Sequence, residues 1–197
     1  MIRAPCGSVV PWFNIFNAKK TVEDLIEDPQ HEMKIYTFPE PVLKTPAEPI
    51  TEIDGNLQHL IDQMIETMYA APGIGLAANQ VGVLKRVIVF DRQPREKGRD
   101  PAVLINPEVV LSESQITWEE ACLSVVDFSA EVVRKGRVKV QGLDRHGNPL
   151  DIEAEDLLAV CLQHEVDHLN GVLFIDHISS LKRALYKKKL KKILKEQ

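Results

Sequence analysis

The first clear hydrophobic pattern lies in the amino-terminal half of the chain. Apolar residues recur every three or four positions from Leu57 to Met68, and Asp54 stands where it can cap the amino terminus of a helix. This spacing predicts an amphipathic helix that ends near Tyr69, with its apolar face in the core.

A second helix is predicted from Asp156 to Asn170. Asp156 is the expected N-cap, and Gly171 stands where a left-handed residue often ends a helix. The apolar residues of this segment indicate that the helix is largely buried: Leu157, Val160, Leu162 and Leu169.

Between the two helices the pattern is typical of β-strands. Short β-branched runs lie at Arg86 to Asp91, Ala102 to Asn106, Val109 to Ser112 and Ile116 to Cys122. A hairpin is then predicted, because alternating Val138 and Val140 are followed by turn residues 144–148 and a second alternating run at 150–154. The expected fold is α+β, with mainly antiparallel sheets packed around the second helix and a further helix at the carboxyl end.

Three parts of the chain differ in character. Residues 1–32 show no clear period and are treated as an appendage, either a leader, a linker or a start-codon artefact. Residues 33–180 are expected to form one catalytic domain, which opens with a proline-rich, extended lead-in. Residues 181–197 are predicted to form a basic carboxy-terminal helix.

Composition narrows the class of protein. The 197 residues are 44% hydrophobic and 27% charged, which is ordinary for a soluble globular domain. No apolar run reaches the roughly 18 residues that cross a bilayer, and three cysteines argue against a disulfide framework. A cytoplasmic, soluble protein without a membrane partner is expected, and the net charge of -5 does not indicate a general nucleic-acid binder.

The second predicted helix contains His164-Glu165-Val166-Asp167-His168. Residues four apart share a helix face, so both imidazoles can bind one cation, with Glu165 beside them as general base and acid. A solvated face is the alternative, but burying two histidines without a partner is unfavourable. A catalytic site of this kind usually has three protein ligands. Cys122, Cys161 and the carboxylates all remain candidates, because spacing does not rank them.

Three blocks together resemble the peptide deformylases, which remove the formyl group from the initiator methionine of new polypeptides. The blocks are Gly73 to Gln80, Glu120 to Ser124 and His164 to His168, in the order that the family has them. The similarity runs from about Met33 through the mid-180s and is to the bacterial-type branch. It implies a metal-dependent hydrolase of protein biosynthesis that acts on nascent formylated polypeptides and releases formate.

The resemblance implies a metal site made of Cys122, His164 and His168, with Cys161 as a wall of the pocket. It implies ferrous iron as the natural metal, with zinc, nickel or cobalt able to substitute. Cysteine and histidine ligands alone favour zinc.

Catalytic and substrate-binding roles follow from the same resemblance. Glu165 is expected to activate the attacking water, while the Gln80 side-chain amide and the Leu123 backbone N–H stabilise the tetrahedral oxyanion. Ile74 and Gly75 are expected to pair with the substrate backbone; the segment that binds substrate is Gly73, Ile74 and Gly75. Candidate walls for the methionine side chain are Leu157, Val160 and Cys161.

Two residues depart from the family pattern. Ala121 stands where glycine is usual, and Val126 stands where proline is usual. The extra methyl of Ala121 is expected to narrow the cleft, which affects rate and substrate range more than the type of reaction.

The basic end of the chain has two interpretations. It is either a solvated helix with one packed apolar face, formed by Leu181, Leu185, Leu190 and Ile193, or a helix that docks on ribosomal RNA. Two rival functions also remain at this point: a zinc peptidase, which uses the same histidines and glutamate, and a ribosome-binding module without activity.

Overall fold

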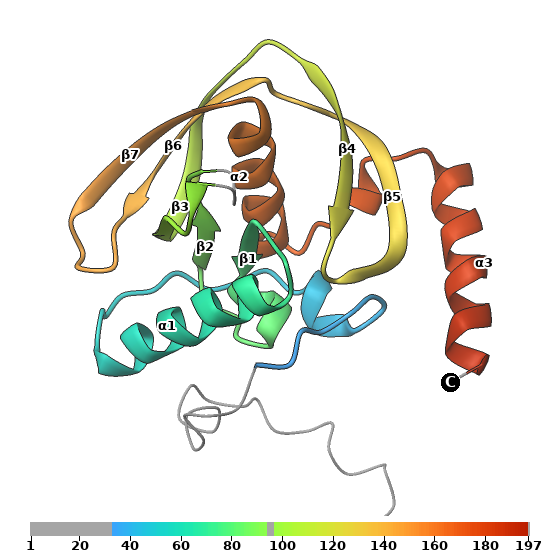
Figure 1. The fold of residues 1–197 in the computed structure, drawn as a ribbon, viewed down its shortest axis with the longest axis horizontal. Coiled ribbons are helices and arrows are strands. Elements are labelled where there is room, and N and C mark those ends of the chain that lie inside the picture. Colours follow the sequence, from blue (N-terminus) through green and yellow to red (C-terminus); the bar gives the residue numbers. More distant parts are fainter. Residues whose placement is uncertain (1–32, 94–96, 197) are drawn as a thin grey trace, which may run out of the picture.

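The computed structural model describes residues 33–93 and 97–196, so the predicted appendage at 1–32 lies outside the described residues. The helices are α1 (Gly55–Ala70), α2 (Asp156–Leu169) and α3 (Ser180–Glu196) (Figure 1). The strands are β1 (Gly75–Ala77), β2 (Val87–Asp91), β3 (Pro101–Glu113), β4 (Ile116–Cys122), β5 (Val125–Arg134), β6 (Arg137–Leu143) and β7 (Pro149–Glu155).

The strands form two antiparallel sheets, as the sequence predicted. One sheet has five strands in the order β1-β2-β3-β6-β7, and the other consists of β4 and β5. The two-stranded sheet stands beside α2 as an arm in Figure 1, which leaves α2 in the middle of the molecule.

Strand β2 shows why α2 is central. Successive side chains of a strand point to opposite faces, and Val87 and Val89 pack in a core cluster with α1, whereas Ile88 and Phe90 pack in a cluster with α2. The larger sheet is therefore covered by α1 on one face and by α2 on the other. The predicted α+β fold with a central helix and a carboxy-terminal helix is confirmed.

The predicted helix ends are partly right. Asp54 caps α1 by accepting a hydrogen bond from the Leu57 amide (2.9 Å), and Gly171 adopts a left-handed φ of 72° after α2. The prediction of Asp156 as an N-cap is wrong. Glu155 occupies that position without a capping side chain, and the Asp156 amide instead donates to the carbonyl of Gly136, which lies between β5 and β6.

Two strand predictions are also corrected. The runs predicted at 102–106 and 109–112 are one strand, β3, because register shifts on either side of residue 108 let its pairing with β6 continue past Pro107. Strand β5 was not predicted at all. From Asp127 on, exposed residues alternate with the less exposed Phe128, Ala130, Val132 and Arg134, so the period of a strand is present in the sequence and was overlooked.

A third core cluster joins the amino-terminal lead-in, β5 and α3. Tyr186 and Leu190 of α3 are buried in it, whereas Leu181 and Leu185 are 70% and 60% exposed. The predicted apolar face of this helix is thus wrong for those two leucines. Tyr186 and Leu190 lie one turn apart and face the body of the protein. Among the described residues, no helix is long and apolar enough to span a membrane.

Candidate active site

Three potential metal ligands meet where β4 ends beside α2. The helix presents His164 and His168 one turn apart on the same face, and Cys122 is the last residue of β4. The Nε2 atom of His168 lies 3.2 Å from the Cys122 sulfur and 3.2 Å from the His164 Nε2 atom. These are the three residues that the resemblance implied as ligands. Cys161, although nearby on α2, is not part of this group.

The electrostatics of this group fit a divalent cation. Burial and the neighbouring His164 lower the pKa of His168 well below its usual value, so its imidazole is neutral, the form that binds metals. Burial opposes a charge on His164, yet the Cys122 sulfur and Glu120 raise its pKa well above the usual value. The Cys122 sulfur and Glu120 thus favour positive charge beside His164. A cation held by three such ligands would keep a position for water or substrate, as catalytic metal sites do.

A buried carboxylate orients His164. Glu120 Oε2 lies 2.7 Å from His164 Nδ1. Burial alone would raise the pKa of Glu120, but hydrogen bonds from His164 and Arg134 and the charge of Arg134 lower it to about 2. An ionised carboxylate only accepts, so Nδ1 donates and Nε2 is directed at the ligand group. This contact lets Glu120 fix the orientation of a ligand histidine.

Arg134 is a functional residue that sequence reasoning missed. It donates to both carboxylate oxygens of Glu120 (2.6 and 3.1 Å) and to Asp167 (2.6 Å). Asp167 also hydrogen-bonds His177 (2.7 Å). The network ties β4, β5 and α2 together around His164. Arg134 was overlooked because β5 was not predicted and because its partners, Glu120 and Asp167, lie on two other elements.

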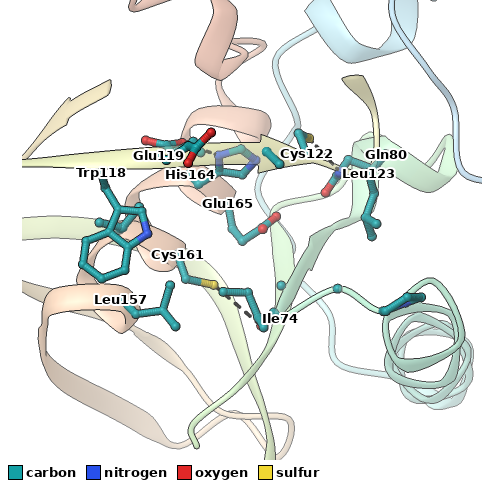
Figure 2. A pocket seen from close by; sticks show the side chains of 16 residues that line it. Ile74, Gln80, Trp118, Glu119, Cys122, Leu123, Leu157, Cys161, His164 and Glu165 are labelled. Carbon is teal, nitrogen blue, oxygen red and sulfur yellow. Dashed lines mark hydrogen bonds and ion pairs between the residues drawn. The ribbon is translucent and has the colours of Figure 1, made fainter. Parts of the chain in front are cut away.

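Glu165 lies at the bottom of the cleft shown in Figure 2, beside the ligand group. Its side chain is 4% exposed, and burial, with a smaller effect of Glu120, raises its pKa to about 7. Oε2 has no hydrogen-bond partner among the described residues. Oε1 packs against the backbone of Gly75, where a Cβ would lie only 2.5 Å from it. Gly75 is therefore required for the position of the carboxylate rather than for a left-handed backbone.

Gln80 connects the first motif to the second. Its Oε1 accepts from the Ala77 amide (2.8 Å), while its Nε2 donates to Ser124 Oγ (3.1 Å) and approaches the Cys122 sulfur (3.7 Å). The side chain is buried and held at both ends, so its amide protons have a fixed direction toward the ligand group. Leu123, the next residue after Cys122, is partly buried and lines the same cleft.

The cleft has a volume of about 320 Å³ and runs between two extended segments (Figure 2). Residues 73–75 form one side, the end of β4 forms the other, and α2 forms the floor. Leu157 is 44% exposed at this floor, which corrects its assignment to the buried face of α2. The structure thus brings together every predicted site residue: Gly73, Ile74, Gly75, Gln80, Cys122, Leu123, His164 and Glu165 line the cleft, and His168 completes the ligand group.

Trp118 and Glu119 also line the cleft, and sequence reasoning did not select them. For Trp118 a signal was present, because every second residue of a strand shares a face and Trp118 precedes Glu120 and Cys122 by that spacing.

Comparisons with known proteins agree with this geometry. The family model described as polypeptide deformylase matches residues 32–184. A peptide deformylase of Thermodesulfovibrio yellowstonii is 58% identical over 159 residues, which cover 81% of this chain and 96% of that protein. One of Cellvibrio japonicus is 51% identical over 161 residues, covering 81% and 94%.

Solved structures give the same result. The crystal structure of a peptide deformylase from Legionella pneumophila superimposes with a TM-score of 0.79 at 44% identity, covering 85% of this chain and 98% of that one. A peptide deformylase from Synechococcus elongatus in complex with actinonin superimposes with a TM-score of 0.75 at 38% identity, covering 89% and 91%.

Proposed function

This chain belongs to the polypeptide deformylase family, and we propose how its own residues divide the work of the family's reaction. The chain is a metal-dependent hydrolase that removes the N-formyl group from nascent polypeptides. The proposal concerns the ligands, the natural metal and the roles of the residues that line the cleft. The observation that carries it is the Cys122, His164 and His168 group beside buried Glu165 in a single cleft.

Cys122, His164 and His168 are the proposed ligands, and ferrous iron is the proposed natural metal. A divalent cation bound there acts as a Lewis acid, which polarises the formyl carbonyl and acidifies water. Zinc, nickel and cobalt are proposed substitutes because thiolate and imidazole ligands suit all of them.

Glu165 is the proposed proton carrier. Its free Oε2 accepts a proton from the attacking water and returns that proton to the amine nitrogen as formate leaves. Burial raises the pKa of this carboxyl to about 7 before any cation binds, and this burial favours uptake of the proton from water.

Gln80 and Leu123 are the proposed donors to the developing oxyanion. The Gln80 amide is already oriented by Ala77 and Ser124, so donating to the oxyanion requires little reorganisation. The Leu123 N–H belongs to the turn that follows Cys122 and supplies the second donor.

The substrate is proposed to lie as an extended chain between residues 73–75 and β4. Ile74 and Gly75 pair with its backbone, as an added strand pairs with a sheet edge. The methionine side chain then contacts Leu157, Val160 and Cys161, all of which line the cleft.

Two acylated forms of one peptide test this proposal. Protein loaded anaerobically with ferrous iron or nickel is expected to release formate from formyl-Met-Ala-Ser and to leave acetyl-Met-Ala-Ser almost intact, because the acetyl methyl enlarges the group that must enter beside Glu165. Cleavage of the internal Met-Ala bond, measured by chromatography, would indicate a peptidase instead. Absence of any product from metal-loaded protein would favour a binding module.

The ribosome is a proposed partner, through the basic face of α3. Lys188 and Lys191 are exposed on this helix, which carries many further lysines. The substrate is made on the ribosome, and phosphate attraction would hold the enzyme near it. The same substrate makes the cytoplasm the proposed compartment.

Reversing two of these charges tests the ribosome proposal. A Lys188→Glu/Lys191→Glu variant is expected to cosediment less with ribosomes and to reduce the slope of log affinity against log salt by about two. Its turnover of formyl-Met-Ala-Ser should not change. Lys34→Glu, an exposed lysine outside α3, is the matched control. Equal ribosome binding by both variants would argue that α3 is only a solvated, packed helix.

A further inference from the structure

Helix α3 touches the start of β5, just after the turn that follows the cysteine ligand. The Tyr186 hydroxyl donates to the Val126 carbonyl (3.4 Å), and Lys189 Nζ donates to the Asp127 carbonyl (2.8 Å). These two carbonyls lie four and five residues after Cys122, at the start of β5. Asp127 has a left-handed φ of 52°, and Val126 has no ring to restrain its own φ. The contacts from α3 therefore fix the backbone of a segment whose own sequence does not restrain it.

The same tyrosine begins a row of stacked rings that ends at a ligand. Tyr186 stacks on Phe128 of β5, with ring centroids 4.5 Å apart, and Phe128 stacks on Phe174 at 6.0 Å. Phe174 in turn stacks on His164 at 6.1 Å. We call Tyr186, Phe128 and Phe174 the aromatic column. It comes from three separate elements, and packed interiors transmit displacement because they contain few voids.

Burial makes the column a fixed part of the site. Tyr186 is 1% exposed, and its burial, together with nearby Cys122 and Asp127, raises its pKa to about 12, so the phenol keeps its donor proton. Cys122 is itself packed against this third core cluster. One residue of α3 therefore supports both Cys122, through the turn, and His164, through the rings.

We propose that Tyr186 is a positioning residue for the metal site, which makes α3 a support of the catalytic centre as well as a basic surface. The inference rests on the proposed function of Cys122 and His164 as ligands. Contacts outside the ligand shell fix ligand orientation, and their loss commonly weakens metal binding about 10- to 100-fold. The hydrophobic contacts of the column act in this way on His164, beside the hydrogen bond from Glu120.

The test measures metal release as well as activity. Wild type, Tyr186→Leu, Tyr186→Phe and Phe128→Leu are loaded with cobalt, whose thiolate absorption band reports the bond to Cys122. The rate of cobalt transfer to a chelator is then measured, beside kcat and KM for formyl-Met-Ala-Ser. Leu60→Ala is the matched control, because it empties a buried position of α1 in a different core cluster.

Tyr186→Leu is expected to release cobalt about tenfold faster, with a shifted thiolate band and a lower kcat at nearly unchanged KM. Phe128→Leu, which interrupts the column without altering α3, should do the same, and Tyr186→Phe, which keeps the ring but loses the hydrogen bond to Val126, should release cobalt at a rate between those of wild type and Tyr186→Leu. Release from Tyr186→Leu and Phe128→Leu at the wild-type rate would overturn the proposal. The proposal would also be overturned if Leu60→Ala released cobalt as fast as Tyr186→Leu when the two variants are compared at equal loss of thermal stability. A wild-type protein that binds cobalt and transfers it to the chelator, but does not release formate from formyl-Met-Ala-Ser, would refute the proposed function instead.

Discussion

Replacing Glu165 by glutamine is expected to lower kcat about 1000-fold, in the range that general acid–base catalysis contributes. The amide has the shape of the carboxylate, so it fits against Gly75, but it cannot accept the proton of the attacking water. The bound metal should remain, because Glu165 contributes none of the three donor atoms. Formate release and the metal content of the same sample are the two measurements.

Glu119→Gln is the matched control for this variant. Glu119 is an exposed carboxylate of the same cleft, where it accepts a hydrogen bond from Ser129, and its replacement makes the same change of side chain outside the ligand group. Near-normal turnover is expected. Substantial activity of Glu165→Gln with full metal content would show that another group carries the proton.

Replacing Cys122 by serine is expected to remove the metal. A neutral hydroxyl is a much poorer ligand than a thiolate for iron, nickel or zinc. Loss of a ligand should exceed the effect of losing an outer contact, so the affinity is expected to fall by at least about 100-fold. Titration with nickel or cobalt measures the affinity, and the lost thiolate absorption band identifies the bond.

Cys161→Ser is the control that the chain itself offers. Cys161 is buried on α2 and its sulfur lies 3.6 Å from the Ile74 carbonyl, to which a serine hydroxyl can also donate. Burial raises the pKa of this thiol well above its usual value, which keeps it protonated. Normal metal content is expected. Metal lost from Cys161→Ser and kept by Cys122→Ser would reverse the ligand assignment.

Features that depend on neighbours in the sequence were predictable. The spacing of His164 and His168 within one helix brings both to the same face in any fold that keeps the helix. The cap of α1 by Asp54 and the left-handed Gly171 are likewise local, because each depends on backbone geometry within a few residues. The sequence alone therefore determined α1, α2 and two of the three proposed ligands.

The choice between Cys122 and Cys161 as the third ligand did not depend on neighbours in the sequence. Spacing favoured neither, and only the family resemblance pointed to Cys122. In the structure, β4 and β5 pair and pack on the third core cluster, and this packing places Cys122 beside the histidines. Cys122 and the two histidines are more than forty residues apart in sequence.

The tertiary structure alone decided which residues surround the ligands. Arg134 meets Glu120 of β4 and Asp167 of α2 only in the folded protein, and Asp156 loses its capping role to a contact with Gly136. In α3, Tyr186 rather than Leu185 faces the core, because the surface that packs against this helix contains the aromatic rings of β5 and of the segment after α2. A helical pattern defines a period, but which side of the helix is buried depends on the surface that packs against it.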